Sequence, residues 1–315
     1  MPTTAFLFPG QGSQTVGMGA DLYEQFPEAR AVIDEAADSL QFPLKDLMFG
    51  QGGDPEVEKA ALTETHVTQP ALYVHSLAAF AVLEKRGHAP DMTAGHSLGE
   101  YSALAAAGAL DFDEGLALVQ LRGQLMGRAG DERPGTMSAV LGMDAEALER
   151  LCEEITDTGE GVVQCANFNA PGQIVISGDA DAVARAGEAA RAQGAKRVVP
   201  LPVGGAFHSP LMAYARDGLG AALENAEIRA PRCPVYLNVT AQPTTDPDEI
   251  RRRLLEQLTA PVRWAQTLEA MQADGADRFV EVGAGKVLAG LVKRTLGRRT
   301  ETATFGTAEE LAELS

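Results

Sequence analysis

The sequence predicts an α/β protein in which a small domain is inserted into a larger one. Three observations lead to this prediction. The chain has 315 residues, and at about 150 residues per domain this length fits roughly two domains. Up to about residue 128, short apolar runs alternate with longer helical stretches, which is typical of a parallel sheet with crossover helices. Beyond a polar break at residues 130–135, the order of the elements changes.

The first part of the chain is expected to alternate strands with helices. The expected strands are residues 5–8 and 92–94, and the expected helices are residues 70–85, 98–110 and 111–128. Asp111 followed by Glu114 resembles a capping box, which is typical of a helix start. Near the end of the chain, residues 235–239 and 278–282 are expected to add two more strands.

The middle of the chain follows a different pattern. We expect strand, helix, strand, strand, helix and strand at residues 136–141, 145–155, 161–167, 173–177, 180–193 and 196–201. This βαββαβ order is the ferredoxin-like split unit. We therefore predict a small domain over residues 130–204 and a discontinuous large domain over residues 1–129 and 205–315.

Composition excludes several classes of function. The formal charge is −18, because 44 acidic residues outnumber 26 basic ones, and this argues against nucleic-acid binding. No apolar run approaches the roughly 18 residues of a membrane span, and the first residues lack the basic start of a signal peptide. The three cysteines are widely spaced and no metal-ligand spacing occurs. We expect a cytoplasmic protein without a metal ion.

The segment Gly95–Gly99, with sequence GHSLG, fits the pattern G-x-S-x-G. A short strand is expected before it and an Ala-rich helix after it, which is the context in which this motif presents a nucleophilic serine. Ser97 would then lie exposed at the turn, at the positive end of the following helix. The alternative is an incidental glycine-rich turn between a strand and a helix.

A nucleophilic serine needs a base, and His208 is the best candidate among the five histidines. It follows the last strand of the small domain and precedes Ser209 and Pro210, which are typical of a helix start. Its side chain would therefore lie over a helix end, not in the core. The alternative is a histidine with only a structural role in the loop.

Arg122 lies within the apolar face of its helix, with Leu118 and Met126 one turn away on either side. A buried guanidinium is costly unless an anion pairs with it. The partner could be an internal Asp or Glu, or the carboxylate of a substrate, which a guanidinium can bind through two hydrogen bonds.

The loop after the first strand, FPGQGSQ at residues 8–14, resembles a dinucleotide-binding fingerprint but lacks its third glycine, since Thr15 occupies that place. We interpret it instead as a tight loop that offers backbone N–H groups beside Ser97.

Seven motifs together resemble one family over nearly the whole chain. They are FPGQGSQ, GHSLGEYSAL, the LRG around Arg122, NFNAPGQIVISG, FHSPLM, QLTAPVRW and EVGAGKVL. This combination resembles the malonyl-CoA:acyl carrier protein transacylases of bacterial fatty acid synthesis and the related acyltransferase domains of polyketide synthases. The resemblance implies an α/β-hydrolase-like large domain with a ferredoxin-like small one.

The resemblance also implies a mechanism and a set of site residues. Ser97 would accept the malonyl group of malonyl-CoA, His208 would act as its base, and the phosphopantetheine thiol of an acyl carrier protein would take the group in a ping-pong scheme. No cofactor is implied. The resemblance further implies that the main-chain carbonyl of Gln257 orients His208 and that the N–H groups of Gln11 and Leu98 form the oxyanion hole.

For the substrate, it implies that Arg122 pairs with the malonyl carboxylate and that Phe207 favours malonyl over methylmalonyl. The residues implied to line the site are Gln69, Asn169 and Gln173.

Two alternative functions stay open at this point. They are a trans-acting polyketide synthase acyltransferase and a serine hydrolase or thioesterase. Carrier proteins of this pathway are themselves usually acidic, so a local basic patch is expected on this acidic chain. The candidates are Lys196 with Arg197, or Lys293, Arg294, Arg298 and Arg299.

Overall fold

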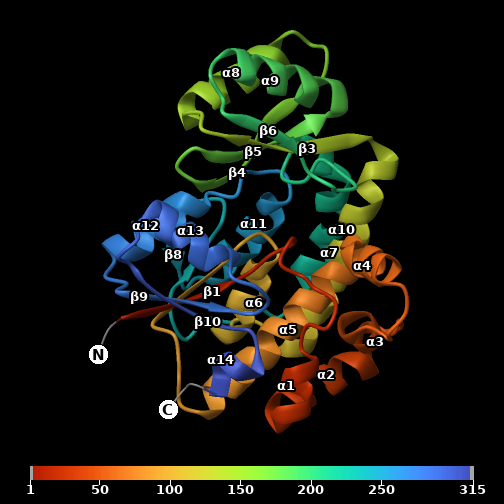
Figure 1. Cartoon of the computed structure of the whole chain (residues 1–315), viewed down its shortest axis with the longest axis vertical. Coiled ribbons are helices and arrows are strands. Elements are labelled where there is room, and N and C mark those ends of the chain that lie inside the picture. Colours follow the sequence, from red (N-terminus) through yellow and green to blue (C-terminus); the bar gives the residue numbers. More distant parts are fainter. Residues whose placement is uncertain (1–2, 313–315) are drawn as a thin grey trace.

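Two sheets organise the computed structural model of the protein, which describes residues 3–312 (Figure 1). The larger sheet has six strands in the order β10-β9-β1-β2-β7-β8, and the smaller sheet has four in the order β4-β5-β3-β6. The predicted α/β class is confirmed. Residues 1–2 and 313–315, which begin and end the predicted large domain, lie outside the described residues.

The larger sheet is built around a central strand that is buried on both faces. Its strands are β1 (Thr4–Phe8), β2 (Met92–Gly95), β7 (Val235–Tyr236), β8 (Pro243–Thr244), β9 (Arg278–Val282) and β10 (Glu301–Phe305). β1 pairs in parallel with β2 and β9, and Phe8 lies opposite Gly95. The carboxyl ends of β1 and β2 therefore meet at one edge, and the loops that follow them lie side by side there. Ligand sites of parallel sheets form at such edges.

Helices cover both faces of this sheet. Phe6 and Phe8 pack into one apolar cluster, and Ala5 and Leu7 pack into another on the opposite face, as expected for a strand whose side chains alternate. The helices are α1 (Ala20–Gln25), α2 (Pro27–Ser39), α3 (Leu44–Phe49), α4 (Pro55–Thr63), α5 (Thr65–Lys85), α6 (Gly99–Ala106), α7 (Phe112–Glu132), α10 (Ala213–Asn225), α11 (Pro247–Gln257), α12 (Trp264–Ala273), α13 (Val287–Thr295) and α14 (Ala308–Ala312).

The smaller sheet carries two helices on one face and turns the other toward the large sheet (Figure 1). Its elements follow the predicted βαββαβ order: β3 (Gly135–Leu141), α8 (Ala145–Asp157), β4 (Val163–Ala170), β5 (Gln173–Asp179), α9 (Ala180–Ala192) and β6 (Arg197–Pro200). All six lie within residues 130–204. The division of the chain into domains at those boundaries stays a prediction.

One short bridge joins the smaller sheet to the rest of the chain at β4. Val262, five residues after α11, donates its N–H to the carbonyl of Ala166 at 2.8 Å and accepts from the N–H of Phe168 at 2.8 Å. β4 lies at the edge of its sheet, so this bridge uses backbone groups that no strand of that sheet would otherwise pair.

Several predicted boundaries were wrong. α5 begins at Thr65 instead of residue 70, so Pro70 lies inside the helix. α7 continues through Glu132 and into the predicted break; it ends just before Pro134, because the residue that precedes a proline disfavours helical geometry. α6 ends at Ala106 instead of residue 110, and Gly108 follows in a left-handed conformation with φ of 78°. Helices α1–α4 were not predicted. They follow one another within residues 20–63 without a strand between them.

Candidate active site

Ser97 lies in a sharp turn between β2 and α6, as the GHSLG motif predicts. Its backbone is left-handed, with φ of 53°. A Cβ atom at Gly95 would lie 1.8 Å from the carbonyl oxygen of Gly99, and one at Gly99 would lie 2.1 Å from that of Phe8. Both contacts are impossible, so the turn can form only with glycine at both positions.

His208 contacts the side chain of Ser97. Its Nε2 lies 2.8 Å from Oγ of Ser97, and its Nδ1 lies 2.8 Å from the main-chain oxygen of Gln257. The ring is 3% exposed, and Ser209 begins the short 3-10 helix η1 (Pro210–Met212) by accepting from the N–H of Leu211. The structure thus brings together the three residues predicted as catalytic.

Electrostatics keep this histidine neutral. Burial, together with the smaller effect of the positive charge of Arg122, lowers the pKa of His208 to about 3. Since a carbonyl oxygen can only accept, Nδ1 carries the proton and donates to Gln257. Nε2 is then free of a proton and can accept one from the Ser97 hydroxyl. This is the arrangement that a general base requires.

Arg122 of α7 is buried, at 1% exposure, and its guanidinium contacts Ser97. Its Nη1 donates to Oε1 of Gln69 at 2.8 Å, and its Nη2 donates to Oε1 of Gln257 at 2.9 Å and to Oγ of Ser97 at 3.1 Å. These three oxygens are neutral, and within residues 3–312 no carboxylate forms an ion pair with it. One internal acidic group does act on Arg122: the buried Glu100 interacts with its charge without a direct ion pair, and burial raises the pKa of Glu100 to about 7. Nε of Arg122 also lacks a hydrogen-bond partner in the part of the chain that the structure describes.

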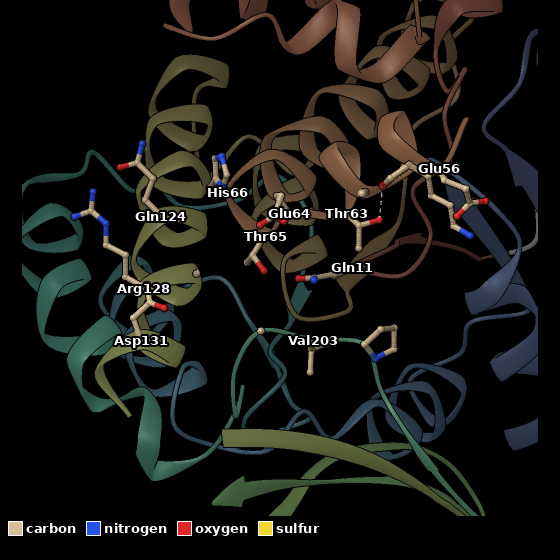
Figure 2. Close-up of a pocket in the computed structure, with 15 residues that line it drawn as sticks. Gln11, Glu56, Thr63, Glu64, Thr65, His66, Gln124, Arg128, Asp131 and Val203 are labelled. Atoms are coloured by element: carbon tan, nitrogen blue, oxygen red, sulfur yellow. Dashed lines mark hydrogen bonds between the residues drawn. The ribbon is translucent and has the colours of Figure 1, made fainter. Parts of the chain in front are cut away.

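A cavity of about 110 Å³ lies over Ser97. Both predicted oxyanion-hole residues, Gln11 and Leu98, line it, and so do Gln69 and Phe207. The smaller sheet closes this cavity with Met137 of β3 and Asn167 of β4. A second cavity of about 910 Å³ adjoins it and shares Gln11 and Val203 with it. Figure 2 shows Gln11 between Thr65 and Val203 on the wall of this larger space.

Two predicted residues lie away from the smaller cavity. The side-chain oxygen of Asn169 is 2.7 Å from Nε2 of His96, so Asn169 contacts the residue that precedes Ser97. Gln173, next to the turn between β4 and β5, accepts instead from Nη1 of Arg294 at 2.9 Å. Neither side chain lines the cavity over Ser97.

Two residues that were not predicted from the sequence contact the Ser97–His208 pair. Asn238 accepts from the N–H of Ser97 at 2.7 Å, and Gln164 donates to the main-chain oxygen of His208 at 2.7 Å. Asn238 follows β7, at the same edge of the parallel sheet as Ser97, and this position could have indicated it. No local signal distinguishes Gln164.

Within residues 3–312, no group of three or more His, Cys, Asp or Glu side chains could hold a metal ion. No helix of that part of the chain combines the length and apolar character needed to cross a membrane.

Almost the whole chain is similar to known acyl transferases. Residues 5–310 match the family described as "Acyl transferase domain". The malonyl CoA-acyl carrier protein transacylase of Bacillus subtilis (strain 168) is 46% identical over 99% of this chain and 96% of its own length. The corresponding Escherichia coli (strain K12) protein is 45% identical over 96% of each chain.

Solved structures are similar to the same extent. The acyl carrier protein S-malonyltransferase of Vibrio cholerae superposes with a TM-score of 0.92 at 41% identity, over 99% of this chain and 100% of that one. The malonyl-transacylase PlMCAT, solved in complex with the type II polyketide carrier protein AntF, gives 0.91 at 42% identity, over 98% and 97%. These similarities confirm the predicted fold class.

Proposed function

The chain belongs to the acyl transferase domain family, and on this basis we propose that it transfers malonyl from malonyl-CoA to an acyl carrier protein for fatty acid synthesis. One observation carries the choice of substrate. Arg122 is buried and forms no direct ion pair with a carboxylate of the described residues, and its Nη2 lies 3.1 Å from Oγ of Ser97. A malonyl group on Ser97 would supply the missing carboxylate.

The first half of the reaction acylates the enzyme. Oγ of Ser97 attacks the thioester carbonyl while Nε2 of His208 takes its proton, and the N–H groups of Leu98 and Gln11 bind the oxyanion. The carbon–sulfur bond then breaks, and His208 returns the proton to the departing CoA sulfur. Malonyl stays on Ser97 as an ester.

The second half reverses these steps with another thiol. The phosphopantetheine thiol of the carrier protein attacks the ester and gives its proton to His208, which then protonates Oγ of Ser97 as the ester bond breaks. This is a ping-pong scheme. The proposed scheme uses no cofactor, and a cytoplasmic location is proposed with it.

Intact mass spectrometry tests this proposal. The protein is mixed briefly with equal concentrations of malonyl-CoA, methylmalonyl-CoA and acetyl-CoA. We expect one adduct of malonyl mass, which disappears when phosphopantetheinylated carrier protein is added. Steady release of CoA without an adduct and without carrier protein would indicate a thioesterase instead.

A polyketide pathway is the alternative for the carrier protein, since one similar structure is a transacylase bound to a type II polyketide carrier. The chemistry on Ser97 would be unchanged. Competition between fatty acid and polyketide carrier proteins for the malonyl adduct distinguishes the two pathways.

Phe207 is proposed to favour malonyl over methylmalonyl. Its ring is buried, adjoins His208 in sequence and lines the cavity over Ser97, so it crowds an α-methyl group. Phe207→Ser should lower the malonyl-to-methylmalonyl ratio of kcat/KM by about 10-fold, because a methyl group in such a pocket is worth about 1–3 kcal/mol. An unchanged ratio would refute this steric account.

The carrier protein is proposed to dock on one basic surface, formed by Lys196, Arg197, Lys293, Arg294, Arg298 and Arg299. The two groups are distant in sequence but adjacent in space. In the smaller sheet, Arg197 of β6 and Gln173 of β5 both pair with Leu141 of β3, which lies between those strands. The side chain of Gln173 in turn accepts a hydrogen bond from Arg294. All six side chains are exposed, and none forms an ion pair within the described chain. This surface offers an acidic carrier protein a positive region on a chain of charge −18.

Charge reversal tests this docking surface. Arg197→Glu with Arg294→Glu should raise KM for carrier protein about 10-fold at low salt and leave KM for malonyl-CoA unchanged, and added salt should reduce the difference. Arg150→Glu, on the exposed side of α8, is the matched control. If both variants gave the same KM for carrier protein, this surface would be excluded.

A further inference from the structure

The Ser97–His208 pair is unusual in its backbone. Among residues 3–312, three non-glycine residues have positive φ: Ser97 at 53°, His208 at 56° and Ala241 at 55°. Side chains of L-amino acids clash with the backbone in this region, so such conformations persist only where surrounding contacts hold them. Two of the three strained residues are therefore the proposed nucleophile and its base.

A single buried amide holds the strained serine at both sides of its turn. Oδ1 of Asn238 accepts from the N–H of Ser97 at 2.7 Å, and its Nδ2 donates to the carbonyl of Gly95 at 2.7 Å. Asn238 is 0% exposed, so bulk water does not compete for these bonds. They connect the end of β2 to the nucleophile across the turn.

The backbone of Asn238 is fixed in turn. Its N–H donates to Oε2 of the buried Glu100 at 2.7 Å, and its carbonyl accepts from the N–H of Arg263 at 2.9 Å. Glu100 lies in α6, the helix that begins directly after the turn. The amide therefore has a fixed position relative to both elements that flank Ser97.

A second amide holds the strained histidine. Nε2 of Gln164, on β4, donates to the main-chain oxygen of His208 at 2.7 Å and to that of Thr259 at 3.3 Å. Thr259 lies two residues after Gln257, whose carbonyl accepts from the His208 ring. Gln164 thus connects the backbone of the base to the segment that orients its ring.

We infer that Asn238 and Gln164 are positioning residues, each of which holds one member of the Ser97–His208 pair in its left-handed conformation. They contact no reacting atom. Their effect is to keep Oγ and Nε2 at 2.8 Å. The role in malonyl transfer rests on the proposed function, whereas the effect on the reactivity of Ser97 does not.

Four variants and two controls test this inference. Asn238→Ala and Gln164→Met remove the amides. Asn238→Asp keeps the oxygen that accepts from Ser97, and Gln164→Lys keeps a donor. Asn225→Ala and Gln193→Met are matched controls at exposed positions at the ends of α10 and α9.

The readouts are kcat and KM for malonyl-CoA and the rate of Ser97 labelling by a fluorophosphonate. We expect Asn238→Ala to lower both kcat and the labelling rate about 10²-fold, and Gln164→Met about 10-fold, since small misplacements of reacting groups have effects of this size. KM should stay within about twofold, because Arg122 is unchanged. Asn238→Asp and Gln164→Lys should recover part of the rate, and the controls should match the parent protein.

Melting temperatures separate strain from a merely structural role. Glycine adopts positive φ freely, so the loss of melting temperature caused by Asn238→Ala should be smaller when Ser97 is replaced by glycine. The same comparison applies to Gln164→Met with His208→Gly. If Asn238→Ala does not fold, Asn238→Asp is measured in its place.

Two results would overturn the inference: kcat and labelling rates within about threefold of the parent for Asn238→Ala and Gln164→Met, or equal losses of melting temperature in both backgrounds. A parent protein that reacts with the fluorophosphonate but forms no malonyl ester would instead refute the proposed function alone.

Discussion

Replacing Ser97 with alanine is expected to abolish the malonyl adduct and to lower the rate of malonyl transfer at least about 10³-fold. The covalent path needs an oxygen nucleophile at this point, and among residues 3–312 no other hydroxyl that lines the cavity is hydrogen-bonded to Nε2 of His208. Intact mass after mixing with malonyl-CoA, together with initial rates of transfer, measures both effects.

Ser102→Ala is the matched control, because Ser102 is a buried serine of α6 that does not line the cavity. It should keep the adduct and the rate. His208→Ala should also lose most of the rate, since the serine would then have no base. A malonyl adduct that persisted in Ser97→Ala would assign the nucleophile to another residue and contradict the proposed mechanism.

Replacing Arg122 with methionine should lower kcat/KM for malonyl-CoA about 10²- to 10³-fold. Removing one partner of a buried charge pair costs about 2–5 kcal/mol, and each 1.4 kcal/mol corresponds to about a factor of ten. Acetyl-CoA has no free carboxylate, so its kcat/KM should not fall in this way. The ratio of kcat/KM for malonyl-CoA to kcat/KM for acetyl-CoA should therefore fall by about the same factor.

Competition between malonyl-CoA and acetyl-CoA on the Arg122→Met variant measures that ratio. Arg216→Met is the control, because Arg216 is an exposed arginine of α10 paired with Asp217. A variant that lost both substrates equally would indicate that Arg122 serves the Ser97–His208 pair and not the malonyl carboxylate.

Much of the site could be predicted because its signals are local. The glycines of GHSLG are needed by the turn itself, and a lone arginine within an apolar helix face reveals a buried charge without any knowledge of its neighbours. His208 could be chosen because a strand end and a helix start lie on either side of it. In each case the physical constraint and the residue lie within a few positions of each other.

The rest depended on contacts between distant parts of the chain. Asn238 lies 141 positions from the serine that it contacts, and Gln164 lies 44 positions from His208. Gln173 was predicted from motif similarity to line the site, yet its amide contacts Arg294, 121 positions away. One helix boundary was missed for a related reason: the residues around Pro70 are buried against the rest of the protein, and α5 includes this proline. The extension of α7 through the exposed Asp131 and Glu132 has no such explanation.

The bridge between β4 and Val262 affects which amino-acid substitutions this fold tolerates. The nucleophile follows a strand of one sheet and the base follows a strand of the other, so any rocking of the sheets would separate the two. The bridge resists such rocking with peptide groups alone, which every residue except proline provides. Side chains that line the two cavities can therefore be substituted, to suit other acyl groups or carrier proteins, while the spacing of the nucleophile and base is retained.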